Sequence, residues 1–207
     1  MSQTLNLHVI NNSEIDLTFA MFANLPSKSN YQTLSLAWLV QQIDNNGNEY
    51  TFTWTLDWAF TWSAAGAAAG YTWGAKGRPV PADPNAAESC AVGFDYDGDF
   101  KFTPTVGTPD GETLLITDSP KVPVPSVKPN SVGIALNGSP VCATQAGPNL
   151  QQAYTLHPTY YIDAGQYTPG YMVDVAETTQ FQQIEFQNGA TTMTATLNQD
   201  NTWSVGS

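Results

Sequence analysis

The sequence predicts an all-β protein: an antiparallel β-sandwich of about ten to twelve strands, with a β-barrel as the alternative. Three observations predict it. Apolar and polar side chains alternate in many short runs, turns containing Pro or Gly separate these runs, and no long run has the period of a helix. The chain has 207 residues, which fits one such domain over residues 1–207.

The alternation begins near the N-terminus. Residues 5–9 and 15–21 flank the turn sequence NNSE and predict an N-terminal hairpin. Residues 34–40 continue the period and lead through DNNGN into YTFTWTLDWAFTWS, residues 50–63. Every even position of this aromatic row is aromatic or leucine, namely Tyr50, Phe52, Trp54, Leu56, Trp58, Phe60 and Trp62.

The aromatic row is expected to be core for most of its length, because its exposure would create a larger apolar patch than soluble monomers tolerate. Fully extended, it would span roughly 46 Å at about 3.3 Å per residue, which exceeds an ordinary strand. The row must therefore bend across two sheets or run past the edge of the core. Trp54 and Trp58 are predicted to be buried, and Trp62 to lie where the row leaves the core.

Residues 64–86 are rich in Gly, Ala and Pro and predict a long ordered loop with at most one short strand. A helix is disfavoured because each interior glycine costs about 1 kcal/mol relative to alanine. Long loops are often functional, and the sole arginine of the chain could clamp a carboxylate. The ligand-binding candidates in and beside this loop are Trp62, Tyr71, Trp73 and Arg78.

The segment FDYDGDFKF predicts a hairpin with a three-residue loop at 97–99, because this register keeps the aromatic residues on one face and places Asp95 opposite Lys101. The last hairpin is predicted to pair Leu197 with Trp203. Asp95, Asp97 and Asp99 also resemble the start of a calcium loop. The EF-hand pattern fails, so a solvated hairpin tip is the simpler interpretation, and the sequence predicts no cofactor beyond this calcium option.

His157 precedes Pro158 in an extended segment and is the one candidate general base. No zinc-protease motif, phosphate loop or nucleophile elbow accompanies it, so no catalytic residue is predicted. His8, the other histidine, falls on the polar face of its expected strand. Further ligand-binding candidates in the tyrosine-rich C-terminal third are Tyr160, Tyr161 and Tyr167. The alternative for these tyrosines is loop packing over the ends of the sandwich.

Composition limits the partners. Only 12% of residues are charged, and the net charge of -12 disfavours nucleic acid and anionic membranes. A surface of Thr, Asn and Gln suits a neutral glycan or a second copy of the chain. No transmembrane segment or signal peptide is recognised, which predicts a cytoplasmic protein or one exported without a classical signal. Cys90 and Cys142 are expected to be free, buried thiols.

Several motifs together resemble the RhiA family of rhizosphere-expressed bacterial proteins, and their order extends from about residue 5 to the end of the chain. They are SLAWLVQ (35–41), FTWTLDWAFTW (52–62), PADPN (81–85), SVGIALNGSP (131–140), QAGPNL (145–150) and HPTYYIDAGQYTPG (157–170). The resemblance implies a single-domain protein without a signal peptide, expressed under quorum control during association with plants. It implies no activity and no site residues.

We therefore expect a non-catalytic β-sandwich that binds a ligand or self-assembles. A lectin-like module that stacks aromatic side chains on neutral sugars is the first alternative. An enzyme acting on a neutral small molecule or glycan, with His157 as its base, is the second. A membrane-lytic β-sandwich is a further alternative.

Overall fold

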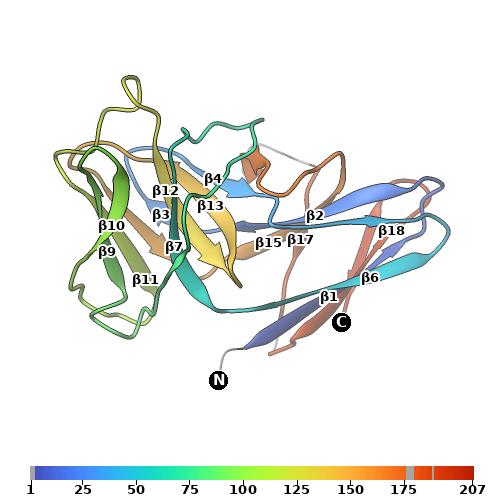
Figure 1. The fold of residues 1–207 in the computed structure, drawn as a ribbon. Helices are drawn as coiled ribbons and strands as arrows, with labels where there is room; N and C mark the ends of the chain where they lie inside the picture. Colours follow the sequence, from blue (N-terminus) through green and yellow to red (C-terminus); the bar gives the residue numbers. More distant parts are fainter. Residues whose placement is uncertain (1–2, 176–179, 188) are drawn as a thin grey trace.

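The computed structural model describes residues 3–175, 180–187 and 189–207 (Figure 1). These residues form 19 strands in four sheets and no α-helix, which confirms the all-β class. Most pairings are antiparallel, and none of the described sheets closes on itself, so the barrel alternative is wrong. The predicted strand number was too low, partly because four strands have only two or three residues and show no period. No helix among the described residues is long and apolar enough to cross a membrane.

Two four-stranded sheets form the first sandwich, on the right of Figure 1. One has the order β19-β18-β1-β6, made of β1 (Thr4–Asn11), β6 (Asn48–Thr55), β18 (Thr192–Leu197) and β19 (Trp203–Gly206). The other has the order β17-β15-β2-β5, made of β2 (Leu17–Asn24), β5 (Leu39–Ile43), β15 (Thr159–Gly165) and β17 (Gln182–Ile184). The inner faces meet where the rings of Trp54 and Tyr160 lie 5.2 Å apart, centroid to centroid.

A five-stranded and a six-stranded sheet form the second sandwich, on the left of Figure 1. The order β10-β9-β11-β14-β3 comprises β3 (Ser27–Lys28), β9 (Ala91–Tyr96), β10 (Phe100–Pro104), β11 (Thr113–Asp118) and β14 (Gln151–Thr155). The order β16-β4-β13-β12-β7-β8 comprises β4 (Thr33–Leu36), β7 (Trp58–Ser63), β8 (Val80–Pro81), β12 (Ser131–Leu136), β13 (Ser139–Gln145) and β16 (Met172–Val173). Across this interior, the Tyr154 hydroxyl donates a hydrogen bond to Thr144 Oγ1 at 3.0 Å.

The chain crosses between the sandwiches through several connections, and we call the four that have only two or three residues the junction. They are residues 25–26, 37–38, 56–57 and 156–158. The third divides the aromatic row into β6 and β7, which belong to different sandwiches. This confirms that the row bends across two sheets. Trp54 is buried as predicted, whereas Trp58, the first residue after the bend, is only partly buried.

The predicted N-terminal hairpin is wrong, because β1 and β2 lie in opposite sheets of the first sandwich. β1 pairs with β6 and β18, whereas β2 pairs with β5 and β15. The reason is a turn that crosses the edge of the sandwich. The buried Asn11 side-chain amide donates to the carbonyls of Ile15 and Ile43, and Ser13 Oγ donates to Asn11 Oδ1. These bonds direct the chain from one sheet to the other.

Both other hairpins have the predicted register. Asp95 faces Lys101 across the loop at 97–99, and Leu197 faces Trp203. Asn201 adopts φ 61°, the left-handed conformation that closes the last turn.

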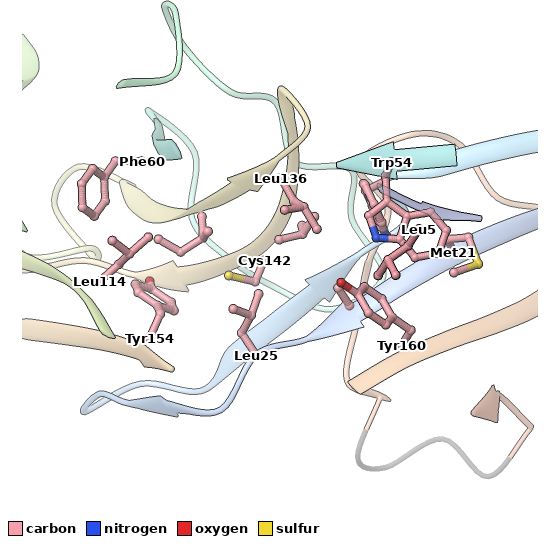
Figure 2. Packing of buried hydrophobic residues seen from close by; sticks show 14 of the residues in the cluster. Leu5, Met21, Leu25, Trp54, Phe60, Leu114, Leu136, Cys142, Tyr154 and Tyr160 are labelled. Atoms are coloured by element: carbon pink, nitrogen blue, oxygen red, sulfur yellow. The ribbon is translucent and has the colours of Figure 1, made fainter. Parts of the chain in front are cut away.

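One apolar core extends through both sandwiches (Figure 2). It runs from Phe60 and Tyr154 in the second sandwich, past Leu25 and Cys142, to Trp54 in the first. Cys90 and Cys142 are both free and buried, as predicted. Burial raises the pKa of the Cys142 thiol to about 12, so it stays protonated and packs as an apolar side chain.

Candidate binding sites

The long loop covers the outer face of a sheet. Trp73, in this loop, is 3% exposed and packs with Leu34, Leu36 and Met172, while its Nε1 donates to Ser131 Oγ at 2.7 Å. At the position expected for one short strand the loop has an isolated bridge between Thr72 and Tyr171, and its one strand among the described residues is β8 (Val80–Pro81). This part of the predicted binding loop therefore serves as packing.

The loop residues proposed as one aromatic site are not brought together. The Trp62 ring faces the interior of the second sandwich and lies 6.1 Å from the ring of Phe94, centroid to centroid. Trp73 lies on the opposite side of the same sheet. Tyr71 and Arg78 are exposed, with 69% of Tyr71 accessible to solvent.

The tyrosine-rich segment also includes packing residues. Tyr161 and Tyr167 join Phe22 in a small apolar cluster on the outer face of the β17-β15-β2-β5 sheet. Tyr167 donates its hydroxyl proton to Asp163 Oδ2. Burial raises the pKa of Asp163, and this hydrogen bond partly offsets the increase. For these tyrosines, packing over the sandwich describes the geometry better than a shared pocket does.

The acidic hairpin tip holds its carboxylates apart. Asp95 accepts a hydrogen bond from Ser119, Asp97 forms an ion pair with Lys101 at 3.9 Å, and Asp99 accepts from the backbone N–H of Phe100. In the ranges that the structure describes, no three His, Cys, Asp or Glu side chains gather in a way that could hold a metal ion. The calcium prediction gains no support from this arrangement.

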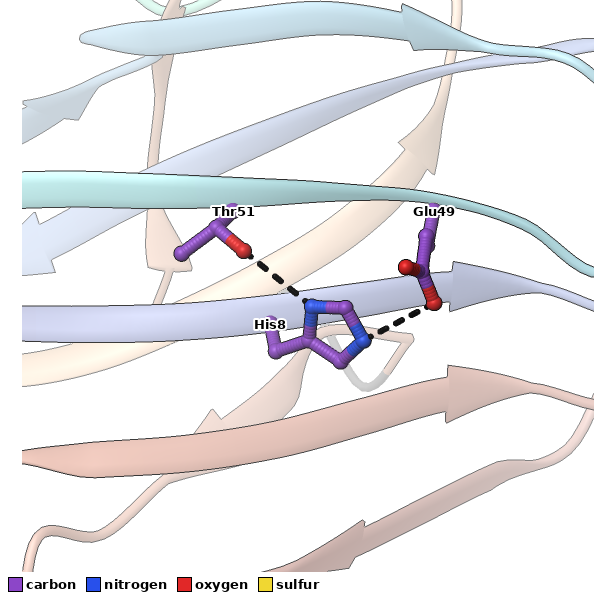
Figure 3. A network of polar contacts seen from close by, with 3 residues as sticks. All are labelled: His8, Glu49 and Thr51. Carbon is purple, nitrogen blue, oxygen red and sulfur yellow. Dashed lines mark hydrogen bonds and ion pairs between the residues drawn. The ribbon is translucent and has the colours of Figure 1, made fainter.

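His8 lies on the polar outer face of β1, as its position in the sequence predicts. Its Nε2 is 3.1 Å from Glu49 Oε2 and its Nδ1 is 3.1 Å from Thr51 Oγ1, both on the neighbouring strand β6 (Figure 3). Cross-strand pairs of this kind stabilise a sheet. The outer position and paired nitrogens suit a surface role.

The structure brings two predicted residues, His157 and Tyr160, into one hollow of about 440 Å³ beside the junction, the junction hollow. Leu5 and Tyr160 come from the inner faces of the two sheets of the first sandwich, so the hollow leads into the space between them. His157 is exposed. Burial raises the pKa of Tyr160 to about 12, which keeps its hydroxyl protonated.

Two larger hollows lie on the second sandwich. The threonine hollow, about 870 Å³, lies on the outer side of the sheet that contains β9, β10 and β11, and it includes Thr103, Thr105, Thr117, Asn149 and Gln151. The tyrosine hollow, about 680 Å³, includes Tyr31, Gln32, Ala67, Pro125 and Pro148. Leu150 lines both hollows. Asn30 lines the threonine hollow, and Tyr31, the next residue in the sequence, lines the tyrosine hollow. We call the two hollows together the groove.

The groove combines polar and apolar side chains and is nearly neutral. A Cβ at Gly93 would lie 2.4 Å from Thr103 Oγ1, so glycine leaves space in the floor of the threonine hollow. The hydrogen bond from Ser119 lowers the pKa of Asp95, and the positive charge of Lys121 contributes to the same shift. Tyr31, 44% exposed, supplies an accessible aromatic ring in the other hollow.

Asp118 supports the wall between the two hollows from inside. Its Oδ2 accepts from Gly147 N at 2.9 Å and from Gln152 Nε2 at 3.0 Å. Asp118 is 2% exposed, and burial raises its pKa to about 6. Gly147 lines the tyrosine hollow, so a carboxyl in the interior fixes part of the groove.

Sequence reasoning missed the groove because its residues come from separate segments and none belongs to a ligand-binding motif; the motif QAGPNL (145–150), which lines both hollows, indicates only the family resemblance. The available signal was Tyr31 in the polar turn SKSNYQ, where an aromatic residue has no strand period to place it in a core.

Comparison with known proteins gives a consistent result over almost the whole chain. A protein-family model described as RhiA matches residues 2–207. Protein RhiA of Rhizobium leguminosarum bv. viciae is 30% identical over an alignment of 207 positions. The alignment covers 94% of this chain and 83% of that protein. No solved structure matches.

Proposed function

The chain belongs to the RhiA family, and from that premise we propose that it is a non-catalytic protein that binds neutral oligosaccharides in the groove. The observation that carries the proposal is the adjacency of two hollows that share Leu150, one rich in hydroxyl and amide groups and the other presenting the Tyr31 ring. Sugars need both kinds of contact, because they have polar edges and apolar faces.

The size and charge of the groove support an extended neutral ligand. The hollows of about 870 and 680 Å³ are each comparable with a small-molecule pocket, so together they suit several sugar units. Asp95 and Lys121 oppose each other in charge, and Asp118 faces the interior. A strongly charged ligand would find no complementary field there.

The geometry favours binding over catalysis. A general base normally needs a second group to orient its ring. His157 makes no side-chain hydrogen bond to any residue within the described ranges, and it lies outside the groove. The two groove carboxyls also face different sides of their sheet, because Asp95 is on the outer face and Asp118 on the inner one.

The test is isothermal titration calorimetry with cellohexaose, laminarihexaose and chitohexaose. We expect at least one to bind, and Tyr31→Ala to weaken that binding by roughly tenfold through loss of the stacking ring. Tyr71→Ala is the matched control, because Tyr71 is also exposed but does not line the groove. The proposal fails if no hexasaccharide binds or if the two variants lose affinity equally.

A further inference from the structure

Asp118 fastens both ends of the segment between the two hollows of the groove. Residues 147–151 each line one hollow or both, and we call them the groove wall. The Gly147 N–H donates to Asp118 Oδ2 at 2.9 Å, and the Asp118 backbone N–H donates to the Leu150 carbonyl at 2.8 Å. A change at this one residue therefore acts on the wall that both hollows share.

The Asp118 carboxyl has one oxygen that lacks a hydrogen bond. Its Oδ2 accepts from Gly147 and from Gln152 Nε2 at 3.0 Å, whereas Oδ1 is buried and pairs with no atom of the residues that the structure describes. The oxygen of the same amide, Gln152 Oε1, is buried and unpaired in the same way. Both oxygens are acceptors while Asp118 is ionised, so neither can satisfy the other.

One proton satisfies both oxygens. A protonated carboxyl donates through one oxygen and accepts through the other, and a primary amide likewise donates and accepts. The two groups can therefore form a closed pair, in which Gln152 Nε2 donates to Asp118 Oδ2 and Asp118 Oδ1 donates to Gln152 Oε1. Burial, which raises the pKa of Asp118 to about 6, favours this neutral form.

The titratable groups around Asp118 leave burial as the largest influence on its carboxyl. Its titratable neighbours inside the sandwich are Tyr154 and Cys142, and burial raises the pKa of both, so they stay neutral. The charged side chains on the adjoining segments are Asp95, Lys121 and Lys128. Asp95 and Lys121 oppose each other in charge, and the Lys128 ammonium lies over the ring of Tyr96.

We propose that Asp118 carries a proton that it donates to Gln152, and that loss of this proton shifts the groove wall and makes ligand binding in the groove depend on pH. The ionised form leaves a buried charge with one oxygen that has no donor, which is costly. Either the Gln152 amide turns or the wall opens to admit water. The pair therefore closes the wall below about pH 6 and releases it above.

A buried water molecule that donates to both oxygens of an ionised Asp118 is the alternative. Such a water would stabilise the carboxylate, so Asp118 would titrate at or below its ordinary pKa of 3.8. The two interpretations differ in the pH at which the carboxyl loses its proton.

The first experiment follows the backbone amide resonance of Gly147 by nuclear magnetic resonance as the pH changes, without any ligand. We expect a transition with a midpoint near pH 6, and the methyl resonances of Leu150 should follow it because the wall moves as a unit. Asp118→Asn should remove the transition, since the asparagine amide donates to Gln152 at every pH.

Asp163→Asn is the matched control for both experiments. Burial also raises the pKa of Asp163, but this residue lies on β15 in the first sandwich. The transition at Gly147 should therefore persist in this variant.

The second experiment repeats the hexasaccharide titrations at about pH 5 and about pH 7, and it rests on the proposed function. The protonated fraction of Asp118 falls about tenfold between these values, so the affinity of the natural chain should fall roughly three- to tenfold. Asp118→Asn should bind at both values as tightly as the natural chain does at the lower one. Asp163→Asn should keep the pH dependence of the natural chain.

The outcomes separate this inference from the proposed function. A Gly147 midpoint near 3.8, or a transition near pH 6 that survives Asp118→Asn, overturns the role of the proton whether or not a sugar binds. A constant affinity, measured while Gly147 titrates near pH 6, overturns the control of the groove. If no hexasaccharide binds, the proposed function fails, and the Leu150 resonances alone decide whether the proton moves the wall: unchanged resonances overturn that movement.

Discussion

The two sandwiches bury different kinds of side chain between their sheets. In the first, apolar and aromatic residues such as Phe19, Met21 and Trp54 fill the interior. In the second, Asp118 and Gln152 are buried on the inner face as well. The threonine hollow, about 870 Å³, belongs to the second sandwich, whereas a hollow of about 720 Å³ lies on the first. The difference indicates that hydrogen bonds from the interior hold the groove wall, whereas apolar packing holds the first sandwich.

Two tyrosines on either side of one junction connection make the same contrast. Tyr154, on β14 in the second sandwich, donates to Thr144, whereas Tyr160, on β15 in the first, lies beside the ring of Trp54. In the apolar interior of the first sandwich, burial raises the pKa of the Tyr160 hydroxyl and the neighbouring Trp54 indole partly offsets the increase. Substitutions in the two interiors should therefore differ in their effect on stability.

The largest effect should come from Trp54→Ala, which opens a cavity in the apolar interior. Trp54 is 1% exposed and lies against the rings of Trp38 and Phe186. We expect a loss of about 3–5 kcal/mol in the free energy of unfolding. Urea denaturation followed by circular dichroism measures it, and a loss below about 1 kcal/mol would show that this interior relaxes far more than its packing indicates.

An intermediate effect should come from Asp118→Asn, and it should depend on pH. Burial raises the pKa of Asp118 from 3.8 to about 6, so the folded chain binds more protons than the unfolded chain between these values. The stabilising contribution is full below pH 3.8 and is lost as the pH rises through 6. The asparagine variant lacks this titration, so its stability relative to the natural chain should improve by about 3 kcal/mol between pH 3.8 and pH 7.

Urea denaturation of both proteins at the two pH values measures this difference. Other groups titrate equally in both proteins, so their contribution cancels in the difference between the two free energies of unfolding. Asp163, whose pKa burial also raises, is one such group. If the difference in the free energy of unfolding stays constant with pH, the pKa of Asp118 is not raised by folding.

The smallest effect should come from Tyr154→Phe in the polar interior. The substitution removes the 3.0 Å hydrogen bond to Thr144 and should lower the free energy of unfolding by about 1 kcal/mol. Tyr160→Phe should cost less, because the Tyr160 hydroxyl has only the Trp54 indole beside it and no hydrogen bond of good geometry to lose. Thermal melts of the two variants side by side check the comparison, and a larger loss for Tyr160→Phe would contradict it.

The alternation of side chains was sufficient to predict the fold class, the bend in the aromatic row and the register of both later hairpins, because these features depend on neighbours close in sequence. The pairing of β1 failed because its partners β6 and β18 are chosen by long-range packing. Trp73 was misplaced for a related reason: a tryptophan in a glycine-rich loop looks exposed until the sheet face beneath it is known. Tyr31 and Gly147 meet at the tyrosine hollow only through folding.

The four connections of the junction also determine how the molecule can be divided. Each sandwich contains strands from both the early and the late part of the chain, such as β2 and β15 in one and β4 and β13 in the other. No single cut can therefore release either sandwich as a complete fragment. Proteolytic nicking within the loop at 64–77 should instead leave two interlaced pieces that separate only when both sandwiches unfold.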